Sequence, residues 1–319
     1  MGVLAGIAGW IFIISLLAGA GIIGLELLWY RLPGGDKKKH YAKRIALVTG
    51  ASSGLGRMYA CLVAERFKDI DEIWLVARRK DKLKETAELI DMKTRYIICD
   101  LSKADETDLL RAVLEEENVR VGVLFNCAGF GKIGDHESLS IEQQTGMTEV
   151  NCIAAVKVTD MCIPRMEKGD HIVNVCSVAA FQPLQKLGIY AATKSFLLKY
   201  TRSLRIELMP RKIQVTAVCP YWIRDTEFID VAADDKKENA HTTADMTKIS
   251  ITNEKTRDKG IKHFVLASDV STVGRVSYFW AMVGMPVVTP GIISTIHRFF
   301  SKLLPDTVLQ YVWGVIRRL

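Results

Sequence analysis

Short β-branched segments alternate with longer helical segments through most of the chain, and this alternation limits its fold more than any other feature. Helical patterns of ten residues or more separate the strand candidates, which lie at residues 45–48, 73–76, 96–98, 121–125, 172–175 and 213–218, with a last one at 286–289. A helix between two strands carries the chain back, so that the strands run parallel and helices cover both faces. The sequence therefore predicts an α/β fold with a doubly wound parallel sheet.

The chain begins with a long uncharged segment. Residues 2–25 contain no charged side chain, and as a helix at about 1.5 Å per residue they would span about 36 Å, enough for a hydrocarbon core of about 30 Å. A cleaved signal peptide would need positive charge ahead of a shorter apolar run, and a buried core helix would show a polar face. We expect one transmembrane helix, and the basic residues after it place the body in the cytoplasm.

The net charge of +7 is uneven along the chain. Residues 1–44 hold six basic and two acidic side chains, and the rest is close to neutral, which argues against a nucleic-acid-binding surface. The histidines and cysteines show no metal-ligand spacing, so no metal site is expected. The predicted organisation is a membrane anchor (1–30), a basic juxtamembrane linker (31–43), the α/β domain (44–290) and an amphipathic helical extension (291–319).

A glycine-rich motif, TGASSGLG at residues 49–56, follows the first strand candidate and opens a helix. Glycines in this position let the backbone approach a pyrophosphate at the helix N-terminus, as in a Rossmann-like dinucleotide site. The second strand candidate ends in Val76-Ala77-Arg78-Arg79, without the acid that binds the ribose of NAD. Arg78 is the better candidate for a 2′-phosphate, with Arg57 assisting, unless these arginines are only surface charges. NADP(H) is therefore favoured, and NAD(H) stays open.

A second motif places Tyr190 and Lys194 one helical turn apart on the same helix face. An ammonium near a phenol favours the phenolate and lowers the phenol pKa toward the range useful for proton transfer. Ser177, just past the fifth strand candidate, would add a hydroxyl beside that phenol. The alternative is an ordinary pair of side chains on a helix surface.

Taken together, TGASSGLG, Asn126-Cys127-Ala128-Gly129, Asn151, Ser177, Tyr190 and Lys194 resemble the short-chain dehydrogenase/reductase family in order and spacing. The resemblance implies that Tyr190 is the general acid and base, and that Lys194 lowers its pKa and binds the nicotinamide ribose. It implies that Ser177 holds the substrate carbonyl and that Asn151 holds a proton-relay water.

The same resemblance implies a set of cofactor contacts from the loops after the strands. These are Gly50, Ser52, Ser53, Gly54, Leu55, Gly56, Arg78, Asp100, Leu101, Asn126, Ala128, Gly129, Tyr190, Lys194, Pro220, Ile223 and Thr226. Two departures stand out: Cys127 replaces the usual second asparagine, and Tyr221 replaces the glycine that usually follows Pro220. Thr226 also lies one place later than usual, so the loop over the nicotinamide is expected to differ.

The expected function is NADP(H)-dependent interconversion of a ketone and a secondary alcohol on an apolar, lipid-, acyl- or steroid-like substrate. The layout resembles the membrane-anchored 3-oxoacyl-CoA reductases and hydroxysteroid dehydrogenases. The alternative is a membrane-tethered nucleotide-binding scaffold or sensor without turnover. Family members often form homodimers through the helices that carry Asn151 and Tyr190. The C-terminal extension is expected to lie on the membrane, to cover the substrate cleft or only to pack on the domain.

Overall fold

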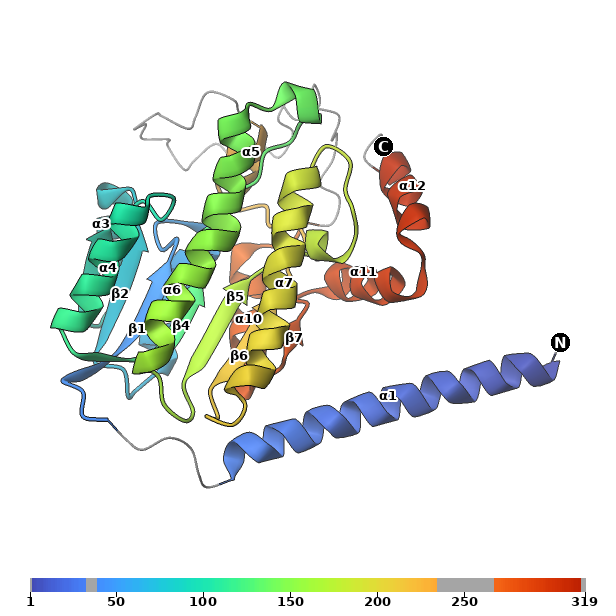
Figure 1. The fold of residues 1–319 in the computed structure, drawn as a ribbon, viewed down its shortest axis with the longest axis horizontal. Helices are drawn as coiled ribbons and strands as arrows, with labels where there is room; N and C mark the ends of the chain where they lie inside the picture. The colour runs from blue at the N-terminus through green and yellow to red at the C-terminus, as the bar shows by residue number, and fades with distance from the viewer. Residues whose placement is uncertain (1, 33–38, 234–266, 317–319) are drawn as a thin grey trace.

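The computed structural model describes residues 2–32, 39–233 and 267–316, and it contains one seven-stranded parallel sheet (Figure 1). The strands are β1 (Lys43–Thr49), β2 (Glu72–Ala77), β3 (Thr94–Ile98), β4 (Val119–Asn126), β5 (His171–Val175), β6 (Gln214–Val218) and β7 (Val287–Val288). Their order is β3-β2-β1-β4-β5-β6-β7, so the sheet grows in opposite directions from the neighbouring strands β1 and β4. The predicted doubly wound α/β fold is confirmed.

Helices cover both faces of the sheet, as the alternating pattern predicts. One face packs against α2 (Gly54–Arg66), α3 (Lys80–Glu88) and α10 (Val270–Val283), with the Tyr59 and Phe125 rings stacked at 4.6 Å. The other face packs against α4 (Ala104–Glu116), α6 (Ala155–Cys162) and α7 (Gly188–Leu208), which lie in front in Figure 1. The apolar sides of the helices in each set therefore pack together on one face of the sheet.

The sequence pattern predicts one continuous helix over residues 140–166, and the structure divides it. α5 (Ile141–Thr148) passes into a π-helical segment, η2 (Glu149–Ala154), before α6 and a 3-10 turn, η3 (Ile163–Arg165). A π segment adds a residue to the helical turn, and such segments often occur at functional sites. Asn151 lies in this wider turn, where its side chain bonds the Phe130 backbone in both directions. Hydrophobic periodicity does not detect this local insertion.

The N-terminal helix α1 (Gly2–Arg31) is the one helix, among the residues that the structure describes, that is long and apolar enough to cross a membrane. Its last turns dock on the body. Glu26 pairs with Arg205, which is 2% exposed and also donates to the carbonyl oxygens of Val215 and Gly284 at 2.7 Å each. Tyr30 is buried beside this arginine.

Parts of the predicted segments fall outside the described residues. They are residues 33–38 of the basic linker and residues 317–319 of the C-terminal extension. The polar stretch at 224–262 is predicted from its sequence to be a loop with short helices over the carboxyl edge of the sheet, and its residues 234–262 also lie outside the described part.

The C-terminal extension forms α11 (Ile292–Leu303) and α12 (Asp306–Ile316). The inner face of α12 packs on the body through Leu309 and Trp313, whose indole Nε1 donates to the Gln185 carbonyl oxygen at 3.1 Å. The outer faces of the two helices leave apolar side chains exposed: Ile292, Ile296, Phe299, Phe300, Val312 and Val315. The extension therefore packs on the domain and also keeps an apolar surface.

A buried chain of amides and hydroxyls connects the centre of the sheet to α6 and α7. Asn126 donates from Nδ2 to Asn174 Oδ1 and to Thr159 Oγ1, both at 2.9 Å, and Asn174 donates from Nδ2 to Thr201 Oγ1 at 2.9 Å. These residues are 4% exposed or less. Buried polar groups need such partners, so each member depends on the others.

We expect Asn174→Ala to lower the free energy of unfolding by about 2–4 kcal/mol, because it leaves Thr201 and Asn126 with an unmade buried hydrogen bond and a small cavity. Urea unfolding of the detergent-solubilised chain, followed by circular dichroism, measures the change. Thr145→Ala, on the exposed face of α5, is the control, with an expected change within about 0.5 kcal/mol. Equal stability of the two variants would contradict the importance of this chain of bonds.

Candidate active site

The candidate site lies at the carboxyl edge of the sheet, where β1 and β4 diverge. The Thr49 hydroxyl accepts hydrogen bonds from the backbone N–H groups of Cys127 and Ala128 at 3.1 and 3.2 Å, which ties the two loops together. Gly50 has a φ of +65°, and a Cβ there would lie 2.8 Å from the Ala128 nitrogen. Ligands of open α/β sheets bind at such a switch in strand order.

The glycine-rich loop is packed closely and leads directly into the first turn of a helix. A Cβ on Gly56 would lie 2.3 Å from the Gly50 carbonyl oxygen, and Gly54 has a φ of +52°. α2 starts here, and the Ser53 side chain makes no capping hydrogen bond to its first N–H groups. These donors and the positive end of the helix dipole suit a diphosphate. Leu55 is buried and packs into the core beneath the loop.

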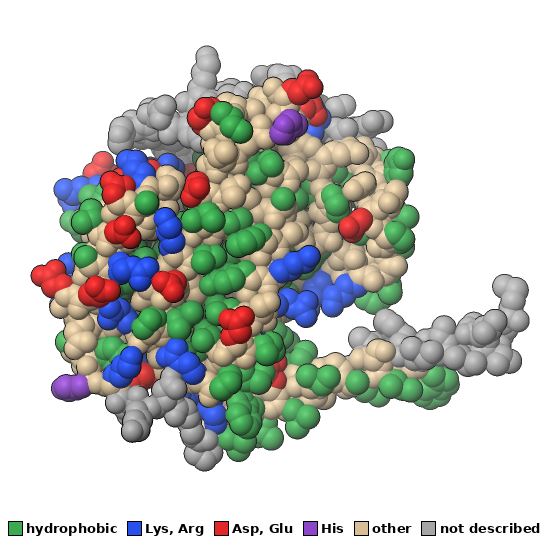
Figure 2. All heavy atoms as spheres, viewed as in Figure 1, with side chains coloured by type: hydrophobic (Ala, Val, Ile, Leu, Met, Phe, Trp, Pro, Cys, Tyr) green, Lys and Arg blue, Asp and Glu red, His purple; other side chains and the backbone are tan. Residues whose placement is uncertain are grey.

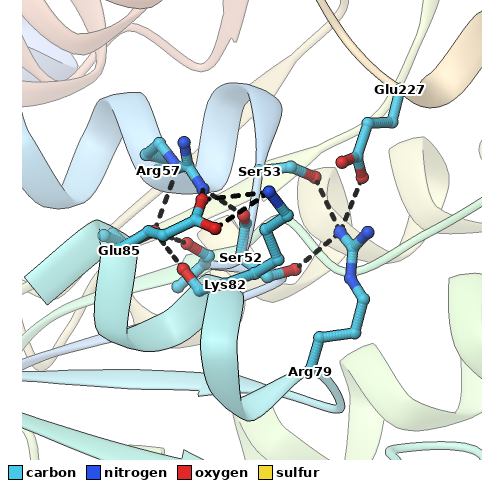
Figure 3. Close-up of polar contacts among 9 residues, drawn as sticks. Ser52, Ser53, Arg57, Arg79, Lys82, Glu85 and Glu227 are labelled. Atoms are coloured by element: carbon cyan, nitrogen blue, oxygen red, sulfur yellow. Dashed lines mark hydrogen bonds and ion pairs between the residues drawn. The ribbon is translucent and has the colours of Figure 1, made fainter. Parts of the chain in front are cut away.

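Two arginines hold the loop, and they are not the pair that the sequence favours. Arg79 Nη2 lies 3.2 Å from Ser52 Oγ, 3.5 Å from Ser53 Oγ and 2.6 Å from Glu227 Oε2 (Figure 3). Arg57 donates to the Ser52 carbonyl oxygen at 2.8 Å. Arg78 is further out, with its side chain 63% exposed and its Nη1 4.0 Å from Asp100 Oδ2. Arg78 and Arg79 both follow the end of β2, and the sequence alone does not show which of these two side chains reaches the loop.

The loops after β3 and β4 place their predicted residues in different ways. Asp100 Oδ1 accepts from the Ser102 backbone and hydroxyl at 3.1 and 2.7 Å, and Leu101 is buried next to it. The amide of Asn126 is engaged with buried side chains, so it shapes the turn from below. A Cβ on Gly129 would lie 2.8 Å from Asn151 Oδ1 and 3.2 Å from Lys194 Nζ. Gly129 thus lets the β4 loop reach the predicted catalytic residues.

The predicted catalytic residues come together from three elements. Lys194 Nζ, on α7, lies 5.7 Å from the ring centroid of Tyr190 and donates to the Val175 carbonyl oxygen at 2.9 Å. The η2 residue Asn151 donates to the Phe130 carbonyl oxygen and to Thr193 Oγ1 at 2.9 and 3.0 Å. Ser177 follows β5, and its hydroxyl accepts from the Ala179 N–H at 3.1 Å.

Burial dominates the electrostatics of this group. Desolvation raises the pKa of Tyr190 well above its usual value, and the interaction with the Ser177 side chain works in the opposite direction. Burial lowers the pKa of Lys194. The sequence predicts a lowered pKa for Tyr190, and the structure differs, because the phenol is only 7% exposed and the ammonium is bonded to the Val175 carbonyl.

The segment after β6 runs across the front of the site. The Pro220 carbonyl oxygen accepts from the Val178 N–H at 3.0 Å, and Ile223 forms a β-bridge with Ser268. Thr226 donates from Oγ1 to the Ile223 carbonyl oxygen at 3.1 Å, and its Cγ2 lies 3.4 Å from the place of a Cβ on Gly54. Tyr221, in place of the usual glycine, is partly buried.

Sequence reasoning missed three residues of this segment. The Phe228 ring lies 5.4 Å from the Tyr190 ring and 6.3 Å from the Trp222 ring, and Glu227 binds Arg79. The run Tyr221, Trp222, Phe228 is an aromatic signal in an otherwise polar stretch. Only the folded chain shows that the Phe228 ring packs on the predicted catalytic tyrosine, with the Trp222 ring behind it.

Comparisons with known proteins agree with this arrangement. The family model of the short chain dehydrogenases matches residues 44–237. An uncharacterized oxidoreductase of Staphylococcus epidermidis is 29% identical over 215 residues, 66% of this chain and 91% of that protein. The very-long-chain 3-oxoacyl-CoA reductase of Rattus norvegicus is 28% identical over 250 residues, 75% of this chain and 78% of that protein.

Among solved structures, a short-chain dehydrogenase from Sphingobium yanoikuyae in complex with NADPH superimposes with a TM-score of 0.64 at 25% identity, over 82% of this chain and 93% of that one. The chain is thus a dehydrogenase or reductase that acts on CH–OH groups with a nicotinamide cofactor. It belongs to the short-chain dehydrogenase/reductase family.

Proposed function

We propose that the protein is a membrane-anchored, NADP(H)-dependent reductase or dehydrogenase that interconverts a ketone and a secondary alcohol on an apolar substrate. The observation that carries the proposal is the convergence of Tyr190, Lys194, Ser177 and Asn151 beside the glycine-rich loop. Nucleotide binding alone needs only the loop, whereas proton exchange with a carbonyl oxygen needs a placed hydroxyl such as that of Tyr190.

Each of these residues would have its own role in the reaction. In reduction Tyr190 donates its proton to the carbonyl oxygen, and its raised pKa keeps that proton in place until a substrate accepts it. Ser177 donates a hydrogen bond to the same oxygen. Lys194 carries a buried amino group beside the phenol and would bind the nicotinamide ribose, and Asn151 would hold a water that returns the proton. The nicotinamide, when bound, supplies or accepts the hydride.

The cofactor would lie along the carboxyl edge of the sheet. Gly50, Ser52, Ser53, Gly54, Leu55 and Gly56 would hold the diphosphate, Asp100, Leu101 and Arg78 the adenosine, and Asn126, Ala128 and Gly129 the middle of the groove. Pro220, Ile223 and Thr226 would contact the nicotinamide. Arg57, Arg78 and Arg79 bring three guanidinium groups to this end of the site, and no acid ends β2, which supports NADP(H) over NAD(H).

The surroundings of Tyr190 support an apolar substrate. Its cluster of buried neighbours includes Ile133, Met147, Leu184, Leu187 and Trp313, with Phe130, Trp222 and Phe228 partly exposed beside them. The similar rat protein bears the name of a very-long-chain 3-oxoacyl-CoA reductase. A long acyl, lipid or steroid-like ketone fits such a lining better than a small polar one.

Membrane anchoring rests on α1, whose described side chains form an apolar surface that extends from the body (Figure 2). The Glu26–Arg205 pair fixes the last turns of the helix to α7. The exposed apolar faces of α11 and α12 suit a body held close to lipid.

The function is tested with Tyr190→Phe. We expect ketone-dependent NADPH oxidation to fall by about 10²–10⁴-fold, because the proton donor is lost, while NADPH binding is kept. The assay uses detergent-solubilised full-length protein, a panel of apolar ketones and both NADPH and NADH. Tyr200→Phe, on the same helix, is the control and should keep the activity. If none of the ketones in the panel supports NADPH oxidation by the native protein, the scaffold alternative replaces this proposal.

The anchor is tested with the double variant Leu17→Arg and Ile22→Arg. Both side chains are two-thirds exposed on α1, and each arginine costs about 2.5–3.5 kcal/mol near the centre of a membrane helix. We expect the native chain to stay with microsomes after alkaline carbonate extraction and the double variant to be released. The control, Leu89→Arg with Leu109→Arg, adds the same charge at exposed sites on the body. Release of the native chain would contradict membrane spanning.

A further inference from the structure

The site for cofactor phosphates contains a carboxylate of the chain itself. Glu227 Oε2 lies 2.6 Å from Arg79 Nη2, and the same nitrogen lies within 3.5 Å of the hydroxyls of Ser52 and Ser53 (Figure 3). These serines belong to the loop that precedes the free N–H groups of α2. An arginine, two hydroxyls and a helix N-terminus form a cradle for an anion.

Glu227 is the anion that this cradle holds in the structure. Burial on its own would raise the pKa of Glu227, but the interactions with Arg79, Ser53 and Lys82 outweigh it and leave the pKa below the usual value. The carboxylate is therefore ionised at neutral pH. The adjacent Thr226 also lies beside the loop, with Cγ2 3.4 Å from the place of a Cβ on Gly54. Segment 226–227 thus faces the phosphate-binding side of the loop.

The same segment covers the predicted proton donor. Phe228 follows Glu227 and begins the short helix α8 (Phe228–Ala233), and its ring lies 5.4 Å from the Tyr190 ring. A Cβ on Gly131 would lie within 3.1 Å of both rings, so the packing there is tight. Tyr190 is 7% exposed, and a substrate carbonyl has to reach its hydroxyl. Phe228 is therefore placed to limit access to Tyr190.

We propose that Glu227 competes with the cofactor for Arg79. The Glu227 carboxylate stays bound to Arg79 until a phosphate of the dinucleotide displaces it. The proposal rests on the proposed function, since it needs a dinucleotide in this groove. A phosphate beside Arg79 repels the carboxylate and takes over its hydrogen bonds. Glu227 then leaves, and Phe228 shifts with it away from Tyr190. The cofactor consequently binds first and opens the site for the substrate.

The test measures nucleotide binding to the full-length protein in detergent by titration calorimetry. We expect Glu227→Gln to bind NADP⁺ about three- to fivefold more tightly than the native protein, the size expected for releasing a partly exposed ion pair. Glu85→Gln is the matched control, because it removes a carboxylate that pairs with Arg57 and Lys82 on the other side of the loop. The change in nucleotide affinity of this control variant measures the general effect of removing one negative charge near the loop.

A second arm identifies the phosphate. Tightening confined to NADP⁺ assigns the position of Glu227 to the 2′-phosphate, and equal tightening for NAD⁺ assigns it to the diphosphate. Both results support the proposal. The proposal is overturned if the Glu227→Gln variant binds the nucleotide no more tightly than the Glu85→Gln variant does. Weaker binding than that of the native protein also overturns it, and shows that Glu227 helps to retain the cofactor.

Hydrogen exchange of residues 227–233 gives a readout that does not depend on affinity. We expect NADP⁺ to speed exchange in this segment of the native protein and Glu227→Gln to show fast exchange without nucleotide. Protection of the segment by NADP⁺ contradicts displacement. If the native protein binds neither nucleotide, the proposed function itself fails, whereas normal binding with an unchanged segment overturns only the role of Glu227.

Discussion

The arrangement of the candidate site depends on the close contact between the loops that follow β1 and β4. A Cβ on Gly50 would lie 2.8 Å from the Ala128 nitrogen of the β4 loop, so Gly50 accommodates no side chain, and the Thr49 hydroxyl accepts hydrogen bonds from two backbone N–H groups of the same loop. This contact places the start of α2 at the carboxyl edge of the sheet. The β4 loop also places Gly129 next to Asn151 and Lys194. The phosphate-binding end and the predicted catalytic end are thus parts of one rigid unit of backbone.

Buried hydrogen bonds continue that unit into the rest of the domain. Asn126, at the end of β4, bonds α6 through Thr159 and β5 through Asn174, and Asn174 bonds α7 through Thr201. α7 carries Tyr190 and Lys194, and β5 leads to Ser177. A buried polar chain of this kind rigidifies its surroundings, because a displaced member would leave further buried groups unpaired. The distances within the candidate site therefore depend on a core that is partly polar.

Much of this fold was predictable from the sequence, because strand and helix periods are local properties. The strand candidates at 45–48 and 121–125 correspond to β1 and β4, which extend beyond them by one or two residues at each end. The glycine motif lies between β1 and α2, as predicted. The features that escaped prediction depend on distant partners. The π turn at Asn151 follows a contact with Phe130, and the choice of Arg79 over Arg78 depends on Glu227, which lies 148 positions further along the chain. No pattern within one segment contains that information.

Two ion pairs of different burial link separate parts of the molecule. Arg205 is buried and bonded to Glu26 and to two carbonyl oxygens, and removing Glu26 would leave a buried charge without its counter-ion. It suits a permanent joint between α1 and the body. The Arg79 and Glu227 side chains are 42% and 36% exposed, so solvent replaces much of what each loses on separation. A weak, solvated pair beside the cofactor groove is suited to exchange with a ligand, whereas the buried pair at the anchor is suited to persist.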